Sequence, residues 1–126
     1  MKDNYSKLYS ILTAQPARSA WARGVREYAE LLLCEHADRF GRDVLPTEAR
    51  MLNGARTWKE YSEGGCALIY DEDIARTLCA PWELRKTDNG RKEPNVSETW
   101  LDVQARALYQ AARLVMDCVQ KLQGEA

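Results

Sequence analysis

Four cations around a tight-turn sequence are the residues whose types and spacing best fit a binding chemistry. Arg85 and Lys86 precede the run Asp88-Asn89-Gly90, and Arg91 and Lys92 follow it. Asn-Gly favours a hairpin turn because both residues tolerate positive φ angles. Such a hairpin gathers four positive side chains on one loop, where they can contact phosphate groups or a partner protein.

The segment before this loop predicts two short helices. Asp71 can cap the first, and Cys79-Ala80-Pro81 ends it, after which Pro81 starts a second helix over 82–87. Helix, three-residue turn, helix is the outline of a helix-turn-helix, with the hairpin in the place of a basic wing. The second helix is short, contains Glu83 and lacks a cluster of side chains that read base edges. An ordinary packing unit with a solvated charged loop is therefore the alternative.

Aromatic residues gather in the sequence around the pair Gly64-Gly65. They are Trp58, Tyr61, Tyr70 and Trp82. Because Trp and Tyr dominate interface energetics, these residues could form a partner surface. Alternatively Trp58 and Tyr61 pack onto the core, which is the interpretation we prefer for Trp58. Trp82 lies in a short charged element, and we place it with the four cations at the binding surface.

His36 is the only histidine, so any Ser-His-Asp or Cys-His catalytic arrangement would have to use it. Helical periodicity puts His36 on an apolar arc beside Leu32 and Leu33, which predicts a hydrogen-bonded core residue. Cys34, the nearest thiol, points about 200° away from it on a helix. The sequence therefore predicts no catalytic residues and no enzymatic activity.

Metal and cofactor signatures are also missing from the pattern. The four cysteines (Cys34, Cys66, Cys79 and Cys118) include no Cys-x-x-Cys pair, so we expect free, mostly buried thiols. The acidic run 71–73 fans out around a helix and is better explained as helix capping. The chain has no glycine-rich phosphate loop and no dinucleotide fingerprint. We expect no metal and no cofactor.

Length and charge limit the class of protein that must position these residues. The 126 residues are enough for one domain, 1–126, and the net charge of −1 argues against a surface that coats nucleic acid or membrane throughout. No apolar run approaches the ~20 residues of a membrane span, and the N-terminus does not resemble a signal peptide. A cytoplasmic location is the expectation.

Breakers and capping residues divide the first half of the chain into helices. We expect a short first helix that ends at Gln15-Pro16, followed by helices over about 16–39, 46–52 and 57–63. Asp3 or Asn4 caps the first helix, and Gly41 ends the second. Asn53-Gly54 is expected to close the third helix, and Thr57 with Glu60 forms a capping-box pattern for the next one.

The last helix, 96–123, has no breaker before Gly124 and is apolar over about half its circumference. A face of that width must touch more than one neighbour, either within the monomer or across a dimer. We expect an all-α bundle of five to six helices with this helix at its centre and the 16–39 helix as its main partner.

Two runs of the sequence resemble small uncharacterised proteins of gut Firmicutes that are often found near phage or conjugative-element genes. These runs are GGCALIYD at 64–71 and ETWLDVQARAL at 98–108, and the likeness extends over residues 57–115. It carries no activity, fold or site residue over to this chain. What it implies is a small regulator or host-interaction protein of a mobile element.

The sequence thus favours a non-enzymatic accessory protein that binds another protein. The predicted surface comprises Trp82, Arg85, Lys86, Arg91 and Lys92. The alternative is a nucleic-acid-binding regulator of helix-turn-helix type that uses 71–92 against phosphate. Because the two share residues, the pattern leaves both open, together with the oligomeric state.

Overall fold

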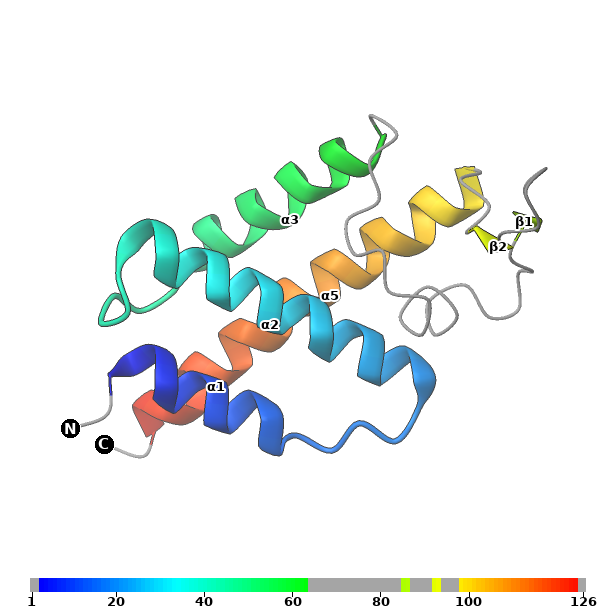
Figure 1. The fold of residues 1–126 in the computed structure, drawn as a ribbon. Helices are drawn as coiled ribbons and strands as arrows, with labels where there is room; N and C mark the ends of the chain where they lie inside the picture. The colour runs from blue at the N-terminus through cyan, green and yellow to red at the C-terminus, as the bar shows by residue number, and fades with distance from the viewer. Residues whose placement is uncertain (1–2, 64–84, 87–91, 94–97, 125–126) are drawn as a thin grey trace.

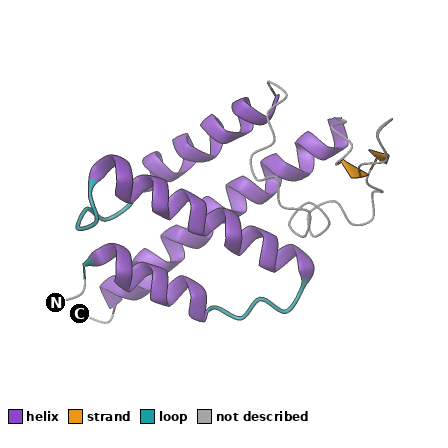
Figure 2. Ribbon diagram, viewed as in Figure 1, coloured by secondary structure: helices purple, strands orange, loops and turns teal. Residues whose placement is uncertain are grey.

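The structure is a computed structural model that describes residues 3–63, 85–86, 92–93 and 98–124. Its helices are α1 (Asn4–Ala14), α2 (Ala20–Phe40), α3 (Glu48–Glu63) and α5 (Glu98–Gly124). The only strands in these residues are β1 (Arg85–Lys86) and β2 (Lys92–Glu93). Four helices therefore build the described part of the chain, which confirms the all-α class (Figure 2). The expected count of five to six is not reached.

Side-chain caps fix where the first two helices begin. The Asp3 carboxylate accepts a hydrogen bond from the backbone N–H of Ser6 (2.7 Å), as a capping residue of α1 should. Ser19 caps α2 in the same way, so the helix begins at Ala20 and the prediction of a start at Pro16 is wrong. Gly41 ends α2 with φ 109°, a conformation that glycine adopts at little cost.

Helix α3 corrects the prediction of two helices over 46–63. The chain continues helically through Asn53 and Gly54, and the Thr57 hydroxyl donates back to the Asn53 carbonyl (2.9 Å) instead of capping a new helix. A Cβ atom on Gly54 would lie 3.3 Å from Leu32 Cδ2. The glycine therefore allows α2 and α3 to approach closely, and tertiary packing outweighs its weak helix propensity.

Helix α5 is the centre of the fold, as expected: it packs against α1, α2 and α3 (Figure 1). Its buried residues are Gln104, Ala107, Leu108, Ala111, Ala112, Val115, Cys118 and Val119. They meet Leu8 and Leu12 of α1, Tyr28 and Leu32 of α2, and Ala55 of α3 in one core cluster. The expectation that α2 is the main partner is only half right, because α3 packs along α5 at least as extensively.

The region of the expected helix-turn-helix is described only in part. The predicted helix over 71–78 lies outside the described residues. The prediction of a helix over 82–87 is wrong at Arg85 and Lys86, which form β1 and pair antiparallel with β2. An antiparallel pair needs extended backbone in both strands, so a helix cannot include these two residues.

Among the described residues, no helix is both long enough and apolar enough to cross a bilayer.

Candidate functional site

Of the five predicted binding residues, Trp82 and Arg91 lie outside the described residues. Arg85, Lys86 and Lys92 lie on the β1–β2 pair, whose register sets Arg85 opposite Glu93 and Lys86 opposite Lys92. The ladder thus brings together three of the expected residues in backbone position. Antiparallel pairing of these two segments is what a hairpin requires, and the predicted turn itself, 88–90, lies outside the described residues.

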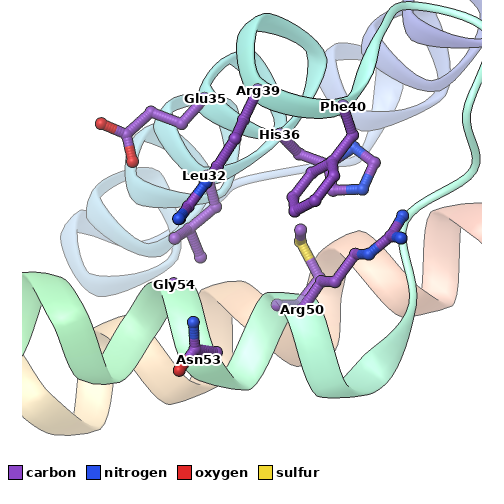
Figure 3. Close-up of a pocket in the computed structure, with 9 residues that line it drawn as sticks. Leu32, Glu35, His36, Arg39, Phe40, Arg50, Asn53 and Gly54 are labelled. Carbon is purple, nitrogen blue, oxygen red and sulfur yellow. The ribbon is translucent and has the colours of Figure 1, made fainter.

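A small pocket at the crossing of α2 and α3 combines several charged side chains with a buried histidine (Figure 3). Its volume is about 70 Å³, which is the space of a few water molecules or one small ionic group. The lining residues are Leu32, Glu35, His36, Arg39, Phe40, Arg50, Met51, Asn53 and Gly54.

The Phe40 ring forms the platform of this pocket. The Arg50 guanidinium carbon lies 4.1 Å from its centroid and that of Arg39 lies 5.8 Å away, both within the range of a cation–π contact. The His36 imidazole packs against the same ring with a centroid distance of 4.8 Å and a tilt of 38°. In Figure 3 Arg39 descends from α2 on one side of Phe40, while Arg50 extends from α3 toward the imidazole.

His36 itself is only 4% exposed, and its Nε2 atom has no hydrogen-bond partner. The prediction of a core histidine is confirmed, but the prediction of a fully hydrogen-bonded one is wrong at this atom. Burial lowers the pKa of His36, and the positive charge of Arg50 lowers it further. The ring is therefore neutral at neutral pH and offers one N–H donor.

The other polar groups around the pocket are already engaged. Glu35 accepts a hydrogen bond from the Trp58 indole N–H (2.7 Å), and Asn53 accepts one from Arg56 (2.8 Å). Among the described residues the one ion pair joins Arg42, at the start of the α2–α3 loop, to Asp3. Arg39 and Arg50 therefore face the pocket without a carboxylate partner in that part of the chain.

Local structure explains why Arg50 reaches this place. The Thr47 hydroxyl accepts from the backbone N–H of Arg50 (3.2 Å), so the arginine stands in the first turn of α3. The loop before it is held to α1, because the Tyr5 N–H donates to the Arg42 carbonyl (2.9 Å) and the Asn4 amide donates to the Asp43 carbonyl (2.6 Å). The start of α3 is thereby fixed against the end of α2.

A second concave surface lies between α3 and α5. This α3–α5 groove has a volume of about 380 Å³. Its lining consists of Glu48, Met51, Leu52, Tyr109, Ala112, Arg113, Met116, Asp117 and Gln120. Leu52 and Tyr109 are 41% and 40% exposed, so an aliphatic and an aromatic side chain stand open to solvent on one groove. Charged residues surround this apolar pair, as at the rim of many interfaces.

The aromatic and thiol groups singled out from the sequence divide between the core and the surface. Trp58 is half-buried and packs at the edge of the core, which agrees with the core interpretation. Cys118 is buried, and burial raises the pKa of its thiol, so it is a poor nucleophile. Cys34 is exposed, which agrees with its predicted place on the helix away from His36. Cys66 and Cys79 lie outside the described residues.

Sequence reasoning missed Phe40, Arg50, Leu52 and Tyr109. A local signal for Tyr109 and Leu52 was available, because each is a large apolar residue with an arginine four residues further along its helix. No local signal joins Arg50 to Phe40, because only the packing of α3 on α2 brings them together.

Comparison of the chain with protein-family models, with curated proteins and with solved structures found no match.

Proposed function

We propose that this chain is a non-enzymatic accessory or regulatory protein that acts by binding another protein, of the kind carried by mobile genetic elements. The observation that carries the proposal is the exposure of Leu52 and Tyr109 on the α3–α5 groove. Aromatic residues and Met are enriched at interfaces, and Met116 adjoins Tyr109 on the same lining. A groove that combines them with a charged rim favours protein recognition.

The occupant we propose is an amphipathic helix of the partner. Two helices form the walls of the groove, and helix-in-groove recognition uses apolar anchors one and two turns apart. Met51 and Met116 on the lining are flexible, so they can adjust to the anchors of such a helix. Glu48 and Asp117 on one hand and Arg113 on the other provide both signs of charge for orienting it.

Trp82 and the cations of 85–92 remain part of the proposed binding surface. Their contribution would be additional to the groove, since a tryptophan and several arginines are frequent hot-spot residues. Trp82→Ala should then weaken partner binding with little change in the thermal midpoint of unfolding. A large loss of stability with unchanged binding would remove Trp82 from the surface.

The test compares partners captured by crosslinking with the wild-type protein, with a Leu52→Ser/Tyr109→Ser variant, and with Val44→Ser. Val44 is a suitable control because it is also 40% exposed but belongs to the α2–α3 loop, away from the groove. We expect a partner that is retained by the control and lost by the groove variant, and whose purified complex protects α3 and α5 from hydrogen exchange. Partners that bind both variants equally would refute the proposal. So would a groove that only joins two copies of this chain, as measured by sedimentation.

A nucleic-acid-binding regulator is the second candidate, and one observation favours it. The register of β1 and β2 sets Lys86 opposite Lys92 in the backbone ladder, with Arg85 next to them, and a cluster of cationic residues is what phosphate binding requires. Binding of duplex DNA should then weaken between about 50 and 200 mM salt with a slope of roughly −3 to −4 in log–log form. An Arg85/Lys86/Arg91/Lys92→Ala variant should not bind. Equal binding at both salt concentrations would exclude this candidate.

A further inference from the structure

The pocket at the α2–α3 crossing combines two observations that the proposed function leaves without a purpose. Two guanidinium groups flank the Phe40 ring with no carboxylate partner among the described residues. The same pocket is lined by His36, whose buried Nε2 atom also has no partner. Buried polar atoms are almost always hydrogen-bonded, so one that is not suggests a missing ligand.

We propose that this pocket is a binding site for one oxyanion group, a carboxylate or a phosphate. Arg50 donates its planar fork to two oxygens of the anion, and the N–H of His36 donates to one of them. Arg39 adds positive charge from the other side of the Phe40 ring. The site lies on the α2 side of α3 and shares only Met51 with the lining of the α3–α5 groove, so it goes beyond the proposed function and does not depend on it.

Charge and hydrogen-bonding capacity both favour an anion in this place. Arginine matches carboxylate and phosphate oxygens in a bidentate geometry, and such charge-assisted bonds are stronger than neutral ones. The neutral His36 ring can carry its proton on Nε2, where it is a donor. Stacking on Phe40 holds the Arg50 guanidinium in place and leaves its N–H edge available.

Size and access set the class of ligand. A volume of about 70 Å³ admits the charged end of a molecule but not a nucleotide or a peptide segment. The Nε2 atom is shielded from solvent, so side chains at the rim of the pocket have to shift before an oxygen can reach it. Side-chain rotamers at a surface interconvert within nanoseconds, so this movement is no obstacle.

The single histidine makes the site directly observable. The imidazole protons of His36 give one resonance pair, which we would follow by NMR during titration with sodium phosphate, sulfate and acetate at constant ionic strength. The titratable groups that line the pocket with His36 are Glu35 and Arg39 from α2 and Arg50 from α3, and α5 contributes none. A bound anion offsets the Arg50 charge, so it should also raise the pKa of His36.

We expect a saturable shift of the His36 signal that differs between anions. Arg50→Gln should weaken the affinity at least about tenfold, since it removes a charged hydrogen-bond donor. Arg50→Lys keeps the charge but loses the planar fork. Its affinity for the anion should therefore lie between those of the wild type and Arg50→Gln. Arg23→Gln is the matched control, because Arg23 is an exposed arginine of α2 outside the pocket lining.

Comparing acetate with phosphate and sulfate distinguishes the two classes of ligand. Preference for acetate would assign the pocket to a carboxylate, and preference for phosphate or sulfate would assign it to a phosphate-type group. A shift that follows ionic strength alone, that never saturates, or that persists in Arg50→Gln would overturn the proposal. Unchanged far-UV circular dichroism of each variant would show that the loss is not one of folding.

Discussion

Replacing Gly54 by alanine tests the close approach of α2 and α3 that sequence reasoning did not foresee. In an unobstructed helix interior, glycine to alanine stabilises by about 1 kcal/mol. Here the new Cβ would lie 3.3 Å from Leu32 Cδ2, and Leu32 is itself buried among core residues. Overpacking a core position by one methyl group costs about 1–3 kcal/mol. We therefore expect Gly54→Ala to lower the free energy of unfolding by about 1 kcal/mol.

The gain in helix propensity and the packing cost of Gly54→Ala can be measured separately in a protein that already carries Leu32→Val. Leu32→Val removes the δ carbons that the new methyl group would meet, at a cost of its own of about 1 kcal/mol. In that background Gly54→Ala should raise the free energy of unfolding by about 1 kcal/mol, as an ordinary helical substitution does. The double-mutant cycle then yields a coupling of about 2 kcal/mol between positions 32 and 54.

The assay is urea unfolding followed by far-UV circular dichroism, with the free energy obtained by linear extrapolation. Gly124→Ala is the control: a Cβ there meets nothing within 4 Å, so it should show no coupling with Leu32→Val. A coupling below about 0.5 kcal/mol for Gly54 would refute the close-packing explanation. A stabilising Gly54→Ala in the wild-type background would do the same.

Three further predictions follow from burial and charge. Arg42→Gln should raise the pKa of Asp3 from about 2 toward its ordinary value of 3.8, since the hydrogen bond from Arg42 is the main cause of the lowering. Because the pKa of Asp3 is lower in the folded state, the stability from Asp3 is present above pH 3.8 and lost as the pH falls toward 2. This loss should be smaller in the variant. An NMR titration in which Arg42→Gln leaves the pKa of Asp3 unchanged would contradict this. The pKa of His36 is also lower in the folded state, so the unfolded state takes up the proton first as the pH falls. The free energy of unfolding, measured by urea titration, should therefore decrease below pH 6.5. The His36→Gln variant should show a weaker dependence on pH. Leu108→Ala should cost about 2–5 kcal/mol because Leu108 is fully buried, whereas Tyr109→Ala should cost far less, and equal thermal shifts for this adjacent pair would be contrary to the fold.

Local chemistry was enough to predict the all-α class and the role of α5. Apolar periodicity identified the long C-terminal helix, and Asp3 and Gly41 marked helix ends correctly because each acts on its own backbone neighbours. Pro16 misled the prediction because a proline suits a helix start, but Ser19 supplies an oxygen for the free N–H groups.

Tertiary packing decided what the local pattern left open. Glycine is common at helix ends, and only the contact of Gly54 with Leu32 on α2 explains why α3 continues through it. The same limit applies to the candidate sites. Arg50 reaches Phe40, and Leu52 shares a groove with Tyr109, through packing that no local spacing reveals.

The close approach of α2 and α3 at Gly54 and the stacking of Arg50 on Phe40 are physically connected. Gly54 and Arg50 are one turn apart on α3, and both line the pocket against α2. The distance that Gly54 permits between the helices is therefore also the distance at which Arg50 stacks on Phe40. If Gly54→Ala moves α3 outward instead of compressing Leu32, the response of His36 to anions should weaken along with stability. If Leu32 yields instead, stability should fall while the anion response stays intact, so measuring both quantities on one variant tells which side of the contact gives way.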